Sequence, residues 1–283
     1  MVLAGHLECE PTEHDVFERR LATDPAEYAS SLLRATGTEW LLVDDGYPPP
    51  GTGTSWDELG ELAGCEARPI MRMERVVEED GEEAVAGEVA TARERGFVAL
   101  KTIAAYRGGL DLDVAPTRVR GPLLTALEAN ETTGNPLPVQ VHCGFGDSDL
   151  HLPRADPGWL KPLLEQFHDT PFVLLHCYPF VREAGWLAHV YGHVWFDLSL
   201  TIPHVSRPAE AVREALELAP VSKLLYASDA ARTPELYLLG ATWWRDALAE
   251  VLTDALPRAG DAEEAGRMIL RDNALELYRP DRP

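Results

Sequence analysis

Short apolar segments recur along the chain and alternate with longer amphipathic or charged stretches. Seven of the apolar segments have the length and the β-branched content of strands. Strands that alternate with helix-length stretches are typical of a parallel sheet with crossover helices. The predicted strands cover residues 40–43, 69–73, 97–103, 138–142, 172–176, 194–198 and 223–228.

The stretches between the predicted strands have the pattern of helices, and each is long enough for a right-handed crossover. We therefore predict an α/β fold of the eight-stranded β/α (TIM) barrel type, which needs one strand more than the seven found. An open doubly wound sheet is the alternative, but Gly51 and Gly53 lack the third glycine of its phosphate-binding loop. The predicted helices cover residues 82–95, 119–131, 159–167, 181–191, 208–219 and 237–256, with a closing helix near 262–278.

Residues 1–37 predict a helical N-terminal segment of two short helices. The second opens at Asp24, with Pro25 in the first helical position and Glu27 placed for a capping box, and it ends at Gly37. A chain of 283 residues has the size of one barrel. We expect a single domain over residues 1–283, in which residues 38–283 carry strands two to eight and the closing helix.

The amino-acid composition argues against nucleic acid and membranes as binding partners. Acidic residues outnumber basic ones by 47 to 25, a formal net charge of −22 that would repel nucleic acid. The sequence contains neither a positively charged, apolar leader at its start nor a stretch of membrane-spanning length, so we expect a cytoplasmic protein that does not bind membranes. Four cysteines without CxxC spacing suit a reducing compartment. A small-molecule substrate is the expected partner, and a homo-oligomer stays open.

Lys101 lies inside an apolar strand of a chain that has only three lysines. An unpaired ammonium group is costly in such surroundings, so the sequence demands a compensating group. One interpretation is an ion pair with an acid such as Glu74. The other is that the nitrogen reacts with carbon dioxide and becomes an anionic carbamate able to bridge two cations.

His142 and His176 end two successive predicted strands, where barrel enzymes place their catalytic residues. A single histidine at a strand end is more often structural, but two of them favour a metal site, because neutral imidazole is a common zinc ligand. Cys143 and Cys177 follow them directly. Because adjacent strand residues point to opposite faces, we interpret both cysteines as packing residues.

Asp229 ends the last predicted strand. Alone it would be read as the cap of the next helix. With Lys101, His142 and His176 it completes a set of polar groups that meet at one barrel mouth, where an acid can bind metal and take a proton from water. Tyr106 and Arg107 could hold an acidic substrate, although Arg107 could equally be a surface residue. Asp147 could contact the substrate or shape a turn, and His204, at the catalytic end of its strand, is a further candidate near the substrate.

The order Lys, His, His and Asp on successive strands resembles the amidohydrolase superfamily. Within that superfamily, the short motifs around these residues resemble one branch. It is the branch related to the N-terminal half of proteins fused to a glutamine-synthetase-like domain. The resemblance covers roughly residues 22–278. Its motifs are residues 99–110 (ALKTIAAYRGGL), 142–147 (HCGFGD), 175–179 (LHCYP), 228–230 (SDA) and 273–278 (NALELY).

This resemblance implies a divalent metal, most often zinc, in one or two copies. The ligands would be His142, His176, Asp229 and, if carboxylated, Lys101. Members of the superfamily also carry a His-x-His pair on strand one, and no such pair occurs in this sequence. We therefore expect strand one to be absent from the chain, either because the true start lies upstream of Met1 or because the pair has been lost.

The function implied is metal-dependent hydrolysis of an amide or other C–N bond by metal-activated water, with Asp229 as general base. A small carboxylate-bearing substrate, such as a γ-glutamyl amide, follows by analogy with the branch. A metal-dependent non-oxidative decarboxylase of a small acid is one alternative. A non-catalytic, degenerate barrel is the other, favoured by the missing His-x-His pair.

Overall fold

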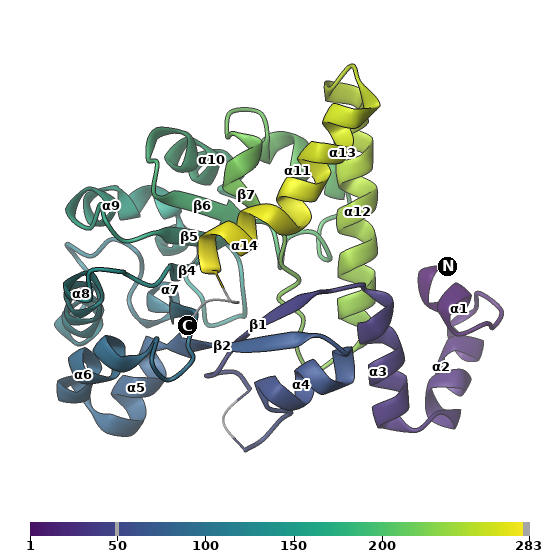
Figure 1. Ribbon diagram of the computed structural model, residues 1–283, viewed down its shortest axis with the longest axis horizontal. Helices are drawn as coiled ribbons and strands as arrows, with labels where there is room; N and C mark the ends of the chain where they lie inside the picture. The colour runs from purple at the N-terminus through teal and green to yellow at the C-terminus, as the bar shows by residue number, and fades with distance from the viewer. Residues whose placement is uncertain (49–50, 280–283) are drawn as a thin grey trace.

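The computed structural model describes residues 1–48 and 51–279 of the chain (Figure 1). Residues 280–283, the end of the predicted domain, lie outside the described residues, as do 49 and 50. Within the described part, seven parallel strands form one sheet in chain order. The strands are β1 (Trp40–Asp44), β2 (Glu66–Arg72), β3 (Ala99–Thr102), β4 (Val139–Cys143), β5 (Phe172–His176), β6 (Val194–Asp197) and β7 (Leu224–Leu225).

The sheet curls into an incomplete β/α barrel, which confirms the predicted fold class. Strands β3, β4 and β5 are buried throughout, whereas every residue of β1 is only partly buried. Strands β1 and β7 end the sheet, and no described strand pairs with their outer edges. The edge position leaves β1 partly open, whereas β7 is buried because the π-helical turn Met268–Asp272 and the last helix, Asn273–Tyr278, pack against it. Among the residues that the structure describes, no eighth strand lies between β7 and β1.

Two apolar layers hold the sheet. The larger lies between the strands and the surrounding helices and includes Met71, Phe172 and Trp244. The smaller lies inside the curled sheet, where Leu225 of β7 packs in one cluster with Leu42 of β1 and with the last helix. This last helix therefore fills part of the space between the two ends of the sheet (Figure 1).

The helices alternate with the strands as predicted, with shorter bounds at several ends. Three were not predicted: α4, which opens with a capping box at Ser55, α5, which follows β2 directly, and the single-turn α7, which follows β3. The helices are α4 (Trp56–Ala63), α5 (Met73–Asp80), α6 (Val85–Thr91), α7 (Ala104–Arg107), α8 (Thr117–Thr132), α9 (Lys161–Gln166), α10 (Val181–Val190), α11 (Pro208–Ala215), α12 (Glu235–Ala255), α13 (Ala259–Arg267) and α14 (Asn273–Tyr278). Short 3₁₀ turns span Glu82–Ala84, Leu152–Ala155, Pro157–Leu160 and Val221–Lys223, and a π-helical turn spans Met268–Asp272.

The N-terminal segment contains three helices rather than the two predicted. They are α1 (Val2–His6), α2 (Glu13–Ala22) and α3 (Pro25–Ala35). The Asp24 side chain accepts hydrogen bonds from the backbone of Ala26 and Glu27, so the predicted start of α3 is correct. Tyr28 and Leu32 of α3 pack on Leu238 of α12, which places this segment beside the barrel mouth. No helix in the described part of the chain is long and apolar enough to cross a membrane.

Candidate active site

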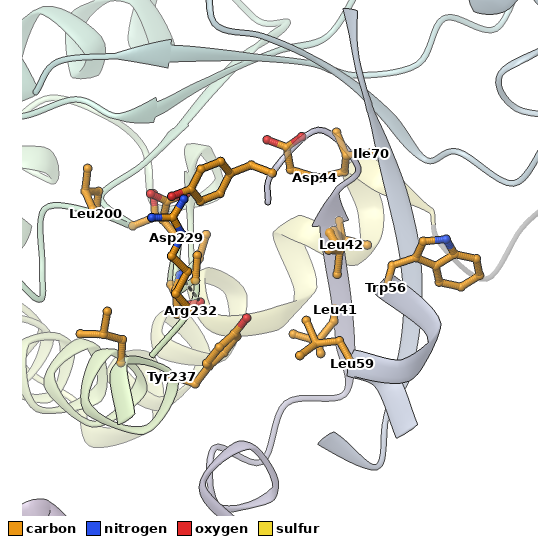
Figure 2. A pocket seen from close by; sticks show the side chains of 18 of the residues that line it. Leu41, Leu42, Asp44, Trp56, Leu59, Ile70, Leu200, Asp229, Arg232 and Tyr237 are labelled. Atoms are coloured by element: carbon orange, nitrogen blue, oxygen red, sulfur yellow. Dashed lines mark hydrogen bonds between the residues drawn. The ribbon is translucent and has the colours of Figure 1, made fainter. Parts of the chain in front are cut away.

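The strands open at their carboxyl-terminal ends into a cavity of about 2320 Å³ to which all seven strands contribute. One wall is apolar and comes from β1 and α4, while the facing wall is polar and comes from the loop after β7 and the start of α12 (Figure 2). In the view of Figure 2, the apolar wall carries Leu41, Leu42, Trp56 and Leu59, and the polar wall carries Asp229, Arg232 and Tyr237. Ligands bind at this end of the strands in barrel folds.

Lys101 faces the cavity from β3, and its ammonium group is compensated by Asp44. The Lys101 Nζ lies 2.9 Å from Asp44 Oδ2, and Arg72 binds the same carboxylate through its Nε at 3.1 Å. The suggestion that Glu74 pairs with Lys101 is wrong, because Glu74 Oε1 accepts hydrogen bonds from Thr102 Oγ1 and the Ile103 backbone instead. Burial would raise the pKa of Asp44, but Lys101 and Arg72 more than offset it, and the pKa is lowered.

His142 and His176 lie against each other at the ends of β4 and β5. Their ring centroids are 4.6 Å apart, and both side chains are buried. Burial lowers the pKa of each imidazole well below its ordinary value, so both rings are neutral near pH 7. Neutral imidazole is the form that binds metal. The Nε2 atom of His142 is buried and has no hydrogen-bond partner within the described chain.

His176 owes its position to a backbone turn. Leu175 lines the cavity, so strict alternation would point the next residue away from it. A left-handed conformation at His176, with φ of 67°, ends the strand and brings the ring to the cavity. Thr201 Oγ1 holds the turn by donating to the His176 carbonyl at 2.6 Å, and Ser199 Oγ lies 2.7 Å from the ring Nδ1.

Asp197 organises this turn from β6. One of its oxygens, Oδ1, accepts from the backbone of His176 at 2.8 Å and from both the backbone and the hydroxyl of Ser199. Complete burial raises the pKa of Asp197 to about 6 despite these bonds. The folded chain therefore holds a proton on Asp197 at pH values where the unfolded chain has lost it.

This shift predicts a pH-dependent stability. Because the folded pKa is raised from 3.8 to about 6, folding stability should fall as the pH rises from about 4 to about 6. The Asp197→Asn variant cannot ionise and should escape this loss, which is on the order of 3 kcal/mol for a shift of this size. Urea unfolding of both proteins at several pH values checks this. Parallel stability curves across this pH range would contradict it.

Asp229 reaches the same cavity from the loop after β7. It has a positive φ of 50°, and its Oδ2 lies 4.0 Å from the Nδ1 of His176. Burial raises the pKa of this carboxyl group, and Lys101 and His142 partly counter that effect. Nearby Tyr237 has a pKa raised to about 12 by burial and by the charge of Asp229, so it remains a neutral phenol.

The residues predicted to contact the substrate lie farther apart around the cavity than the predicted metal ligands, and each has its own partner. Tyr106 lies against His142, with ring centroids 4.7 Å apart, and its hydroxyl accepts from the Asp147 backbone at 3.0 Å. Arg107 forms an ion pair with Glu78 at 2.9 Å at the exposed rim. His204 bonds to the carbonyl of Leu200 at 2.8 Å. All four predicted residues line the cavity, and their roles in substrate binding stay predictions.

Several residues of the cavity were missed by the sequence reading. Asp44 directly follows the predicted strand 40–43, so the rule that selected Asp229 would have selected it as well. Asp197 was visible as an acid inside a predicted strand. Arg232 and Tyr47 gave no signal, because they lie in loops and approach each other from opposite ends of the sheet.

The donor atoms fit a divalent metal in their chemistry. In residues 1–48 and 51–279, no three His, Cys, Asp or Glu side chains are already gathered in the geometry of a metal site. The unpartnered His142 Nε2, the neutral His176 and the carboxylate of Asp229 nevertheless share the cavity and are the ligand types that zinc accepts. Cys143 and Cys177 are fully buried, and burial raises the pKa of both thiols well above the ordinary value, so they act as packing residues.

Comparison with known proteins decides the family. A family model described as Amidohydrolase matches residues 54–279, which is most of the chain. This chain belongs to the amidohydrolase family. Membership confirms the predicted superfamily and supports a metal-dependent hydrolase as the general class of enzyme.

Two relatives place the chain within the amidohydrolases. The protein fluG of Emericella nidulans is 40% identical over 163 residues, which is 55% of this chain and 19% of fluG. The chain thus spans about a fifth of that relative. A crystal structure from Lactobacillus casei ATCC 334, provisionally described as a metal-dependent hydrolase, superposes with a TM-score of 0.84 at 28% identity. That superposition covers 99% of this chain and 83% of the other.

Proposed function

We propose that this amidohydrolase cleaves an amide or other C–N bond of a small carboxylate-bearing substrate, with a γ-glutamyl amide as the representative case. The observation that carries the proposal is the buried His142 Nε2 that has no hydrogen-bond partner in the described chain, on a residue that lines the cavity together with His176 and Asp229. A buried polar atom without a partner is costly, and a metal ligand position accounts for it. The general class comes from the family, and the bond and the substrate are our proposal.

His142, His176 and Asp229 would hold the cation. Ser199 occupies the Nδ1 of His176, which leaves Nε2 of that ring for the metal and fixes the orientation of the ring. When bound, a divalent cation activates water and polarises the scissile carbonyl. Lys101 would join as a carbamate only after it leaves the ion pair with Asp44. We take zinc as the cation, in one or two copies, because of these ligand types.

Asp229 would move the protons of the reaction. Its raised pKa brings the carboxyl group closer to neutral pH, where a group can both accept and return a proton. We assign it the proton of the attacking water and then the delivery of that proton to the leaving nitrogen. Asp229 Oδ2 lies 4.0 Å from His176 Nδ1, so the acid lies beside the ring whose Nε2 we assign to the metal.

A non-oxidative decarboxylase is the second candidate, favoured by one observation. The ion pair of Lys101 with Asp44 holds the lysine as an ammonium group rather than as a carbamate. A site with unmodified lysine favours one metal, which suits the decarboxylases of this superfamily.

Product analysis tests the proposal and separates the two reactions. The purified chain, supplied with zinc and bicarbonate, is incubated with γ-glutamyl amides and, separately, with small aromatic and aliphatic acids. Amine release from the amides supports the hydrolase. Carbon dioxide release from the acids, with no amine from the amides, overturns it in favour of the decarboxylase.

A further inference from the structure

Arg232 stands apart from the other arginines of the cavity. Those arginines are engaged, as with Arg72 on Asp44, Arg75 on Asp45 and Arg245 on the carbonyl of Thr36. Within the described residues, no carboxylate lies within ion-pair distance of Arg232 and no hydrogen bond holds its guanidinium. Within the described part of the chain, its side chain contacts the ring of Tyr47. The five N–H donors of this side chain are therefore available to a ligand.

The contact with Tyr47 positions the guanidinium. Its Cζ lies 4.7 Å from the centroid of the Tyr47 ring, within cation–π range, and Tyr47 comes from the opposite side of the gap in the sheet. Stacking on a ring face leaves the edge of a guanidinium free, and that edge carries the paired donors that match a carboxylate. The ring thus limits the orientations of Arg232 without using up its hydrogen-bonding capacity.

The backbone aims Arg232 into the same cavity as Asp229. Both residues belong to the loop between β7 and α12, both have positive φ values, and both project into the cavity (Figure 2). The φ values are 50° at Asp229 and 62° at Arg232, in a region that residues other than glycine rarely occupy. Two such residues within four positions mark a loop whose shape serves the site rather than local stability.

The charges around the cavity indicate that the ligand is an anion. The chain carries a formal charge of −22, so an anionic substrate needs a local cation to enter the cavity. Lys101, Arg72 and Arg75 are paired with Asp44 and Asp45, and Arg245 is held by the carbonyl of Thr36. Among the cavity arginines and lysines of the described chain, Arg232 is the one with neither an acidic partner nor a hydrogen bond.

We propose that Arg232 binds the carboxylate of the substrate and selects small anionic amides over neutral ones. Tyr47 is a positioning residue that holds the guanidinium ready for this contact. The identity of the cleaved amide rests on the proposed function, whereas the recognition of a carboxylate by Arg232 is measurable without catalysis. Arg107, already paired with Glu78, is the competing residue for this role.

Equilibrium binding of two matched probes tests the proposal. Glutaramate and glutaramide have the same carbon skeleton, but only glutaramate carries a carboxylate. Calorimetry on the zinc-loaded chain should give glutaramate an affinity at least about 10-fold higher, as expected for a bidentate arginine contact. Arg232→Gln should bring the ratio close to 1, Arg232→Lys should leave an intermediate ratio, and Tyr47→Leu should lower it in part.

Control variants make the result specific. Arg213→Gln removes a surface arginine that pairs with Asp254 outside the cavity, and it should keep the full preference. Thermal unfolding of each variant establishes that it folds. An unchanged preference in folded Arg232→Gln, a loss that follows Arg107→Gln instead, or no preference in the native chain overturns the proposal. If Arg232 binds the carboxylate but no amide is hydrolysed, the proposed role of Arg232 is supported and only the assignment as a hydrolase is wrong.

Discussion

Replacing Asp229 with Asn is expected to lower amide hydrolysis by about 10² to 10⁴-fold, the usual contribution of a general acid–base group. Asn keeps the size of the side chain but cannot take or return a proton. The positive φ of 50° suits this substitution, because Asn tolerates the left-handed region better than most residues. We therefore expect the fold to survive, and single-turnover rates of amine release provide the measurement.

The acid Asp147 offers a matched control for this result. Asp147 lines the same cavity from the loop after β4. Its backbone N–H donates a hydrogen bond to the Tyr106 hydroxyl, and within the described residues its carboxylate has no ion pair or hydrogen bond there. Asp147→Asn should therefore change substrate binding more than the rate of the chemical step. Equal single-turnover rates of amine release in the native and Asp229→Asn proteins would show that Asp229 does not act as the general acid–base group.

Gly144→Ala is expected to produce the largest loss of stability, on the order of 3–5 kcal/mol. Gly144 follows β4 with a φ of +74°, and a Cβ there would lie 2.3 Å from the Tyr178 carbonyl oxygen and 2.8 Å from the Cys177 carbonyl carbon. Backbone atoms cannot move aside as the end of a flexible side chain can. Relief of the clash must shift the turn after His176, so metal binding should weaken as well.

Gly87→Ala is the control for that substitution. Gly87 lies inside α6, is exposed, and a Cβ there would meet nothing within 4 Å. Alanine in an unhindered helical position should stabilise the chain by about 1 kcal/mol. Urea unfolding of the two variants measures both changes in the free energy of unfolding, the expected loss and the expected gain. A Gly144→Ala protein that unfolds within 1 kcal/mol of the native chain, about the scale of the Gly87→Ala effect, would contradict the account of this turn.

The strand pattern was predictable because a parallel barrel buries its strands on both faces. Each apolar run of suitable length became a strand, although β7 shrank to Leu224–Leu225 within the predicted range 223–228. Helices α4 and α5 were missed because α4 follows a loop rich in glycine and proline, and α5 begins without an intervening loop at the end of β2.

The polar ends of the strands were predictable for the same reason, since carboxyl-terminal ends of parallel strands meet at one mouth. Side-chain pairing was not predictable. Lys101 reaches across β2 to Asp44, because both lie on the inner face of a curled sheet, whereas Glu74 turns to the backbone of Ile103. Arg232 and Tyr47 meet across the gap between the sheet ends, a contact that depends on how far the whole sheet curls.

Metal content measures the central claim most directly. The chain is loaded with zinc in the presence of bicarbonate, dialysed, and analysed beside His142→Ala and beside His189→Ala, a control in the last turn of α10. We predict about one zinc ion per native chain, retained in His189→Ala and lost in His142→Ala, because His142 Nε2 is the buried donor without another partner. A folded native chain without bound metal, or equal zinc in His142→Ala, would contradict the account and favour a non-catalytic barrel.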